Sequence, residues 1–265
     1  MWLCSIASGS SGNCIYVGSD ATHLLVDTGI SGKRMVSGVE SLGIKPSELD
    51  GILITHEHSD HISGLGVMAR KYEIPIYTTR ETYEAIKQDK KIGLLPEGLF
   101  HEVRYDEKFI LKDMEIYPVR ISHDAKKPVA YRVGCEKKKV GILTDLGNFN
   151  DYIVECMSNL DAVLLEANHD VNMLQVGPYP YYLKQRILGD RGHLSNELCG
   201  RLLDRILHNG TNQGVLGHLS KENNMPELAY ETVRLEIDMS DSPFKAKDFH
   251  LSVAKRSEVS EVIEI

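Results

Sequence analysis

The chain of 265 residues is long enough to bury a sizeable core, and its 42% hydrophobic and 26% charged residues exclude the disordered and fibrous classes. It holds no run of about 18 apolar residues and no basic, apolar leader, so we expect a cytoplasmic protein without membrane contact. The formal net charge of −8 means that any contact with nucleic acid must use local basic clusters.

The N-terminal segments predict three strands around a loop of glycine and serine. We expect strands over 2–6 and 14–18, and a third from residue 23 to the turn at Gly29. Backbone N–H groups of the loop can form an anion-binding concavity, and its small side chains let a phosphate approach. A plain turn without a ligand is the alternative. The candidate phosphate-binding residues in this loop are Ser8, Ser10, Ser11 and Asn13.

Helical and strand patterns then alternate along the chain. Spaced apolar residues predict helices over 31–42, 65–71 and 80–88. Short apolar runs predict strands over 52–55 and 76–78. A second group of strands is expected at 101–103, 108–111, 114–119, 129–133 and 139–143. We expect this second group to supply a second sheet.

The stretch from Ile52 to Gly64 places candidate metal ligands directly after a buried strand. His56 and His58 lie two residues apart, so on extended chain their rings project the same way. Asp60 and His61 can turn back toward a second point. Imidazole and carboxylate suit Zn²⁺, Mn²⁺ or Fe²⁺, and two ions about 3.5–4 Å apart can share a hydroxide nucleophile. The position at a strand end disfavours the alternative, a polar surface loop.

Later strand ends offer the further donors that a dinuclear site needs. A strand pattern breaks at His123, and apolar strands lead directly to Asp145 and to His218. Taken singly, each residue has an equally good structural explanation. His123 could be a surface turn residue, Asp145 the N-cap of a helix over 148–156, and His218 a loop histidine. Glu166 and His169 lie at one more strand end, where we expect them to orient metal ligands.

Residues 55–61, Thr-His-Glu-His-Ser-Asp-His, resemble the T-H-x-H-x-D-H motif of the metallo-β-lactamase fold superfamily. The resemblance implies an α/β fold, a four-layer αββα sandwich with a two-metal hydrolytic site at one sheet edge. The order of the later His, Asp and His matches the superfamily as well. Carried over residue by residue, the resemblance implies one ion on His56, His58 and His123, a second on Asp60, His61 and His218, and Asp145 bridging both.

The run Gly192-His193-Leu194-Ser195, followed by a helical pattern over 198–207, looks like the C-terminal part of RNase Z-type nucleases. Ser195 or Asn196 as helix N-cap explains the local pattern without any ligand. Because phosphodiester hydrolysis needs a proton for the leaving alkoxide, we expect His193 to act as general acid or as a phosphate ligand. A surface histidine beside a helix is the alternative. Asp60 is expected to orient or deprotonate the attacking water.

Over essentially the whole chain the resemblance is closer to the YycJ/WalJ-type subfamily of nucleases. It is carried by stretches such as 8–14, 165–170, 177–181, 185–196 and 218–224. It implies a DNA exonuclease acting from 5′ ends. The β-CASP domain of the RNase J branch is not expected, because the chain between Asp145 and Gly192 is too short to hold it. Asp60 stands where antibiotic-hydrolysing members commonly carry Cys, which disfavours β-lactamase activity.

The least regular stretch, over 170–192, is expected to form an ordered flap or arm. Its tyrosines at 179, 181 and 182 are available to stack on bases, with packing inside the arm as the alternative. The expected phosphate-binding side chains outside the N-terminal loop are Lys184, Arg186, Arg191 and Ser220.

The sequence therefore predicts a metal-dependent phosphodiester hydrolase in a single domain over 1–265. Its cofactors would be two divalent ions, Zn²⁺, Mn²⁺ or Fe²⁺, and its preferred activity is 5′-to-3′ exonuclease action on DNA, with RNA as the alternative substrate. A thioester or lactone hydrolase of the same fold is one alternative function. A metal-bearing regulatory protein without turnover is another, and the sequence leaves the oligomeric state open.

Overall fold

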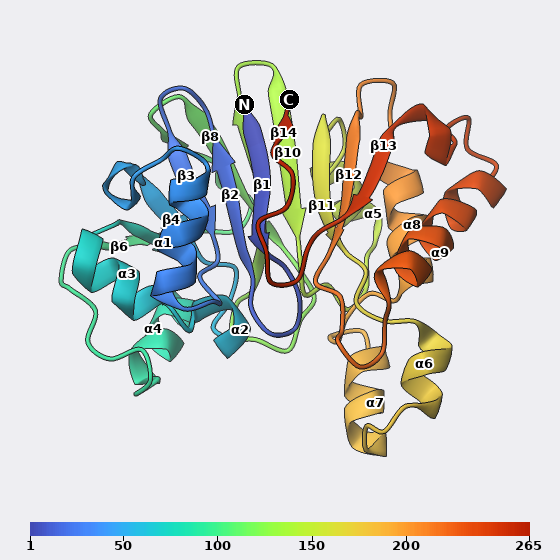
Figure 1. Cartoon of the computed structure of the whole chain (residues 1–265), viewed down its shortest axis with the longest axis horizontal. Helices are drawn as coiled ribbons and strands as arrows, with labels where there is room; N and C mark the ends of the chain where they lie inside the picture. Colours follow the sequence, from blue (N-terminus) through green and yellow to red (C-terminus); the bar gives the residue numbers. More distant parts are fainter.

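Two seven-stranded sheets form the centre of the computed structural model, which describes residues 1–265. The sheets lie face to face, and helices cover both outer faces (Figure 1). The two ends of the chain lie side by side, because the first and last strands pair through Trp2 and Glu264 (Figure 1). The expected four-layer αββα sandwich is confirmed.

The first sheet holds the N-terminal strands and the last strand of the chain. Its order is β14 (Ile263–Glu264), β1 (Trp2–Ala7), β2 (Cys14–Gly18), β3 (His23–Val26), β4 (Gly51–Leu53), β5 (Ile76–Thr78) and β6 (Phe100–Glu102). From β3 to β6 the strands run parallel, so each connection has to cross over the sheet. Those connections contain α1 (Gly32–Ser41), the 3₁₀ turn η1 (Pro46–Glu48), α2 (Ser59–Ile62), α3 (Leu65–Tyr72) and α4 (Arg80–Gln88).

The second sheet takes its strands from the rest of the chain. Its order is β13 (His250–Val253), β12 (Gln213–Gly217), β11 (Ala162–Glu166), β10 (Lys138–Leu143), β9 (Val129–Cys135), β8 (Met114–Arg120) and β7 (Phe109–Leu111). From β10 to β13 the strands are parallel. Their connections contain α5 (Asp151–Cys156), α6 (Val171–Val176), α7 (Tyr181–Leu188), α8 (Asn196–Ile206), α9 (Pro226–Met239) and the 3₁₀ turn η2 (Ala246–Asp248).

Three hydrophobic layers hold the sandwich together. Successive side chains of a strand point to opposite faces, so Leu24 and Val26 of β3 fill the layer between the sheets. Leu25 of the same strand points the other way, into the layer under α1 and α3. The third layer packs α5, α8 and α9 onto the second sheet. Strands buried on both faces are the reason that these segments are almost continuously apolar in the sequence.

Most predicted elements are present with small shifts of their ends, but one strand was assigned to the wrong sheet. β6 belongs to the first sheet, where it pairs in parallel with β5. It follows the crossover helix α4, and a strand after such a helix is placed beside the strand that preceded it. The C-terminal elements α9, β13 and β14 were not predicted.

The stretch between β11 and α8 is more regular than the sequence suggested. It forms two short helices, α6 and α7, which project beyond the sandwich (Figure 1). Asp170 caps α6, since its Oδ1 accepts from the Met173 N–H at 2.7 Å. The segment predicted to form an ordered flap or arm therefore consists of two short helices, and it stands out from the body of the protein (Figure 1).

Both sheets present the carboxyl ends of their parallel strands at the same edge of the sandwich. The loops that follow β3, β4, β8, β10, β11 and β12 meet there, since residues from all of them lie close together. Catalytic residues of α/β proteins commonly occupy such loops. None of the helices combines the length and the apolar character that crossing a lipid bilayer would require.

Candidate metal centre

Three acidic or imidazole side chains at this edge lie on residues with left-handed backbone. Asp27 after β3, Asp145 after β10 and His218 after β12 have φ angles of 62°, 58° and 55°. Such conformations are uncommon outside glycine and cost free energy, so the surrounding structure has to impose them. All three side chains lie next to His61, which follows β4.

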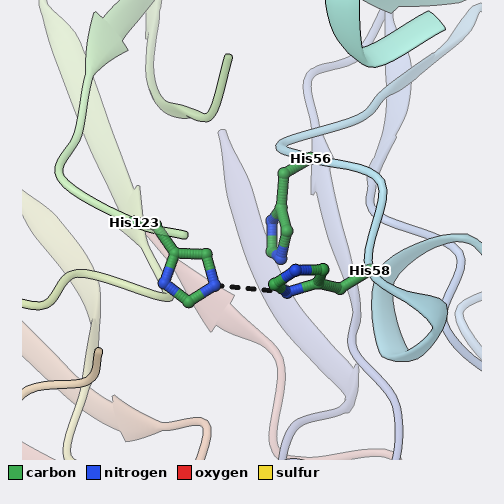
Figure 2. Close-up of side chains that lie close together, drawn as sticks. All are labelled: His56, His58 and His123. Carbon is green, nitrogen blue, oxygen red and sulfur yellow. Dashed lines mark hydrogen bonds between the residues drawn. The ribbon is translucent and has the colours of Figure 1, made fainter. Parts of the chain in front are cut away.

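The first group of convergent side chains is His56, His58 and His123. Figure 2 shows the rings of His56 and His58, from the loop after β4, directed toward His123 from the loop after β8. The His58 Nδ1 and His123 Nε2 atoms are 3.3 Å apart. One ligand atom from each of the three residues falls within 4.8 Å of the others, which is the spacing that one metal ion requires.

The second group is Asp60, His61 and His218. Asp60 Oδ2 lies 3.4 Å from His61 Nε2 and 3.3 Å from His218 Nε2. Asp60 and His61 belong to the single helical turn α2, whereas His218 comes from the opposite sheet. The two groups thus assemble from both sheets.

Asp145 lies between the two groups. Its Oδ2 is 2.9 Å from His61 Nε2 and 3.7 Å from His218 Nε2, and its Oδ1 is 3.6 Å from His123 Nε2. A carboxylate with one oxygen toward each group can bridge two cations. The structure therefore brings all seven predicted ligands together, with Asp145 facing both groups.

Two atoms at the centre of this cluster are buried without any hydrogen-bond partner. They are His56 Nε2 and Asp145 Oδ2, and the latter makes no hydrogen bond although it is 2.9 Å from an imidazole nitrogen. Orphaned buried polar atoms are rare because they lose their hydration without compensation. Divalent cations would satisfy both atoms, so the residues present fit a metal centre.

A second layer of groups holds the other ring nitrogen of several of these histidines. Asp27, fully buried, has Oδ2 at 2.7 Å from His61 Nδ1 and also accepts from the Thr55 N–H and hydroxyl. Thr55 Oγ1 in turn lies 3.0 Å from His56 Nδ1. Because a carboxylate only accepts, the proton stays on Nδ1 of His61 and Nε2 is free for a metal.

Asp27 was not among the predicted site residues. Its position immediately after the apolar run of β3, in the same manner as Asp145 after β10, was the available signal.

Glu166 links a predicted ligand to the predicted general acid. Its Oε1 is 2.7 Å from His218 Nδ1 and 2.8 Å from His193 Nδ1, while Oε2 accepts from the N–H groups of Leu146 and Leu194. His193 Nδ1 is also 3.4 Å from Asp145 Oδ1. The carboxylate of Glu166 therefore orients two imidazoles at once.

His169, expected to have a similar role, lies nearby without a hydrogen bond from its ring. Its two ring nitrogens are buried and unpartnered, and its backbone carbonyl accepts from the Asn196 N–H at 2.9 Å. Its neighbour Asn168 does reach a predicted ligand, since Asn168 Nδ2 donates to the His218 carbonyl at 3.0 Å.

The basic residues of the projecting segment contact the protein in different ways. Arg191 donates twice to the backbone carbonyl of His123, at 2.9 and 3.1 Å, so it fixes a predicted ligand. Arg186 pairs with Asp124, and Lys184 donates to the Gln175 carbonyl at 2.7 Å. Among these three, Arg191 has the most direct link to the metal centre.

The loop after β1 borders the second group of ligands. Ser8 Oγ accepts from the His218 N–H at 2.8 Å, and Asn13 Nδ2 lies 3.2 Å from His61 Nε2. Both side chains are buried, whereas Ser10 and Ser11 are exposed at the tip. Ser220 is buried and its Oγ accepts from the Asn223 N–H at 3.2 Å.

Burial and charge set the protonation of the cluster. The pKa of His218 is raised to about 10: burial alone would lower it, but the neighbouring carboxylates of Asp145, Asp60 and Glu166 outweigh burial. Asp145, Asp27 and Asp60 likewise hold the pKa of His61 well above its usual range, against the effect of burial. Burial and the neighbouring imidazoles lower the pKa of His56. The carboxylates thus form an anionic cavity that favours cations of either kind, protons or metal ions.

The aromatic residues of α7 are exposed. The side chains of Tyr181 and Tyr182 are 77% and 75% exposed, and Val176 at the end of α6 is 86% exposed. The interpretation of the tyrosines as packed inside the arm is therefore not supported for these two residues. All three side chains belong to the segment that projects beyond the sandwich (Figure 1).

Comparison with known proteins gives a consistent result. A family model described as the beta-lactamase superfamily domain matches residues 22–252. The chain is 44% identical over 236 residues to exodeoxyribonuclease WalJ of Streptococcus pneumoniae, covering 89% of this chain and 88% of that protein. It is 39% identical over 236 residues to exodeoxyribonuclease YycJ of Bacillus anthracis, covering 86% of each.

A solved structure supports the fold. The metallo-beta-lactamase fold protein YhfI from Bacillus subtilis matches with a TM-score of 0.69 at 17% identity, over 98% of this chain and 99% of that one.

Proposed function

The chain belongs to the β-lactamase superfamily, and we propose that it works there as an exodeoxyribonuclease that degrades DNA from 5′ ends with two divalent ions. The expected membership of the superfamily, and the similarity to its YycJ/WalJ-type nucleases, are confirmed. The chain is accordingly a hydrolase, and relatives named exodeoxyribonuclease that match over most of its length support a nuclease. The direction of attack, the ion count and the residue roles are the proposal.

The observation that carries the proposal is the convergence of seven donors around two orphaned buried atoms. In this assignment one ion would be held by His56, His58 and His123, a second by Asp60, His61 and His218, and Asp145 would contribute to both. When bound, such a pair supplies an activated water at neutral pH and neutralises charge on the phosphate. Imidazole and carboxylate ligands are compatible with Zn²⁺, Mn²⁺ and Fe²⁺.

The contacts of His193 support its proposed role as general acid. Glu166 holds its Nδ1 at 2.8 Å, so the ring is oriented and Nε2 is the atom available to the leaving alkoxide. The side chain is 19% exposed, which leaves it accessible from the solvent side of the metal centre. Asp60, partly exposed and 3.3 Å from His218 Nε2, is the residue assigned to orient the attacking water.

Substrate binding is assigned to the loop of residues 8–13 and to the projecting helices. The loop touches the second group of ligands through Ser8 and Asn13, so a phosphate there would be close to the metals. Exposed Tyr181 and Tyr182 offer faces on which bases can stack. Lys184, half-buried, and Arg186, exposed, are cations on the same helix that could contact the DNA backbone.

End-labelled substrates test this proposal. Protein stripped with a chelator and reloaded with Zn²⁺, Mn²⁺ or Fe²⁺ is incubated with DNA or RNA labelled at either end, and bound metal is counted by elemental analysis. We expect the 5′ label to leave first as a mononucleotide, while 3′-labelled DNA shortens progressively. Two ions per chain are expected in the wild type and fewer in Asp145→Asn.

Two outcomes would contradict the proposal. Metal-loaded protein that leaves both polymers intact is not a nuclease under these conditions, and hydrolysis of thioesters or lactones instead would favour the other hydrolase class. Release of the 3′ label first would reverse the proposed direction.

A further inference from the structure

The segment after β13 lies against the loop of residues 8–13 and is held there by several contacts. The Ser8 N–H donates to the Lys255 carbonyl at 3.3 Å, and Arg34 Nη2 donates to the Ser257 carbonyl at 3.1 Å. The Ser260 N–H donates to the Ser5 carbonyl at 2.8 Å. The C-terminal part of the chain, red in Figure 1, thereby passes the same edge of the sandwich as the N-terminal loop, blue in Figure 1.

This segment presents the guanidinium of Arg256 directly over Gly9. A Cβ atom built on Gly9 would lie 2.7 Å from Arg256 Nη1 and 3.2 Å from the Leu219 carbonyl oxygen. Any side chain at position 9 would therefore displace the guanidinium. Glycine at this position lets the guanidinium approach the loop backbone this closely.

The guanidinium of Arg256 has no partner of its own. It makes no hydrogen bond and no ion pair, and its Nη1 is buried without an acceptor. Glu222 acts on it electrostatically, but no oxygen of Glu222 comes within ion-pair distance. A buried cationic donor that is left unsatisfied destabilises the fold, so its retention beside a metal centre points to an external anion.

The loop beneath Arg256 also has free donors. The Gly9 N–H donates to Asn13 Oδ1 at 3.0 Å and the Gly12 N–H to the Gly9 carbonyl at 2.9 Å, whereas the N–H groups of Ser10 and Ser11 have no acceptor in the protein. Adjacent free N–H groups in a turn form a concavity suited to a phosphate oxygen. Arg256 lies against Gly9, the residue that directly precedes these two N–H groups in the chain.

The position of Arg256 relative to the metal ligands determines which phosphate of the DNA strand it can bind. Asn13 connects the loop to His61, and Ser8 connects it to His218, so the loop lies between Arg256 and the second group of ligands. A phosphate bound by Arg256 would therefore be a different one from the phosphate being cleaved, such as the next along the same strand.

We propose that Arg256, together with the Ser10 and Ser11 N–H groups, binds a DNA backbone phosphate adjacent to the scissile one. This inference rests on the proposed nuclease function, and it assigns a substrate-binding role to a residue outside the metal centre. A planar guanidinium suits this role, because it can donate two parallel hydrogen bonds to one phosphate.

The test compares Arg256→Gln and Arg256→Lys with Arg201→Gln, a change at an exposed arginine paired with Glu236 on the far helices. Each protein is assayed with a 5′-phosphorylated DNA oligonucleotide and with bis(p-nitrophenyl) phosphate, which has no second phosphate. For Arg256→Gln we expect the ratio of kcat/KM on DNA to kcat/KM on the small diester to fall about tenfold or more. Lysine should restore part of the ratio, and Arg201→Gln should leave it within twofold.

A binding measurement separates this inference from the proposed function. Anisotropy of a labelled oligonucleotide is recorded in the Asp145→Asn background at several salt concentrations. Loss of one phosphate contact should weaken binding and lower the slope of log K against log salt by about 0.7 to 1. Gly9→Ala, which displaces the guanidinium without changing charge, should weaken binding as well.

An equal loss on both substrates, or an unchanged salt slope, would overturn the role of Arg256. Wild-type protein that cleaves no DNA would instead contradict the nuclease function, and the binding measurement would still decide whether Arg256 contacts DNA. Thermal unfolding of each variant shows whether a loss is due to misfolding.

Discussion

Asp27 controls the metal centre from outside its ligand set. It fixes His61 by accepting from Nδ1 and it fixes the start of the ligand loop by accepting from Thr55. In Asp27→Asn one of the two accepting oxygens becomes an amide N–H₂ group, so the side chain can no longer accept from both Thr55 and His61 as it does now. We expect metal affinity to fall about 10- to 100-fold, as is typical for groups that orient a metal-bound histidine.

Titration of the stripped proteins with a competing chelator measures this change. Asp50→Asn is a matched control, because Asp50, just before β4, accepts from the N–H of His23 at the start of β3, whereas Asp27 follows the end of β3. Its metal affinity should equal that of the wild type. Equal affinities for Asp27→Asn and wild type would show that Asp27 only stabilises the loop.

His193 is the residue whose role is most directly testable. In His193→Ala the seven donors remain, so metal content should be unchanged, while kcat on DNA should fall about 10²- to 10⁴-fold for the loss of a general acid. His101→Ala, at an exposed position of β6, is the control. Turnover of His193→Ala at the wild-type rate would remove the proposed role, and loss of metal would reassign His193 to the metal centre.

These residues show which parts of the candidate site can be predicted from the sequence and which cannot. His56, His58, Asp60 and His61 share one short motif, so their chemistry is legible from local spacing. Asp27 and Arg256 lack such a motif. Their importance arises from partners far along the chain, His61 and Gly9, and such pairing appears only after folding.

At the scale of elements, the projecting helices α6 and α7 were the hardest to predict. Each is short, and the run Gly177-Pro178-Tyr179-Pro180 separates them, so neither has enough turns for a helical period to show. The opposite holds for α9. Pro226 at its first turn and apolar Ala229, Val233 and Ile237 on one face were a sufficient signal, and the helix was simply not predicted.

Exposed tyrosines on α7 predict a loss of DNA affinity without a loss of stability. Tyr181→Ala and Tyr182→Ala remove surfaces that are 77% and 75% exposed, so the free energy of unfolding should change by less than about 0.5 kcal/mol. If each ring stacks on a base, affinity for single-stranded DNA should fall by about 1–3 kcal/mol. Anisotropy titrations measure this, with Met239→Ala, 82% exposed on α9, as the control.

At the scale of the whole molecule, the net charge of −8 opposes the approach of a polyanion. Binding must therefore come from a few local contacts, and these are sensitive to salt. With about four phosphate contacts to a single strand, affinity should fall roughly 50-fold between 50 and 200 mM salt. Affinity that is flat over this range would contradict phosphate binding by the loop, Arg256 and α7.

Metal ions at this centre would also join the two halves of the sandwich. His56, His58, Asp60 and His61 follow a strand of the first sheet, whereas the other donors follow strands of the second. Ions bound only by the folded state stabilise it by about 2.7–4 kcal/mol at 100 to 1,000 times the dissociation constant. For a chain of this size, each kcal/mol of stability shifts the Tm by about 2–4 °C. Removing the ions with a chelator should therefore lower the Tm by about 5–16 °C.

We propose further that residues 1–265 unfold as one unit, since the layer between the sheets draws on both halves of the chain. Calorimetry of metal-loaded protein with and without a chelator tests both the single unfolding unit and the stabilisation by bound ions. A single transition is expected in each scan, and the chelated sample should have the lower Tm. Asp145→Asn should melt at a temperature that chelator changes little, because its bridging carboxylate is gone. Two separated transitions would show that the sheets unfold independently, and a Tm unaffected by chelator in the wild type would show that no ion links them.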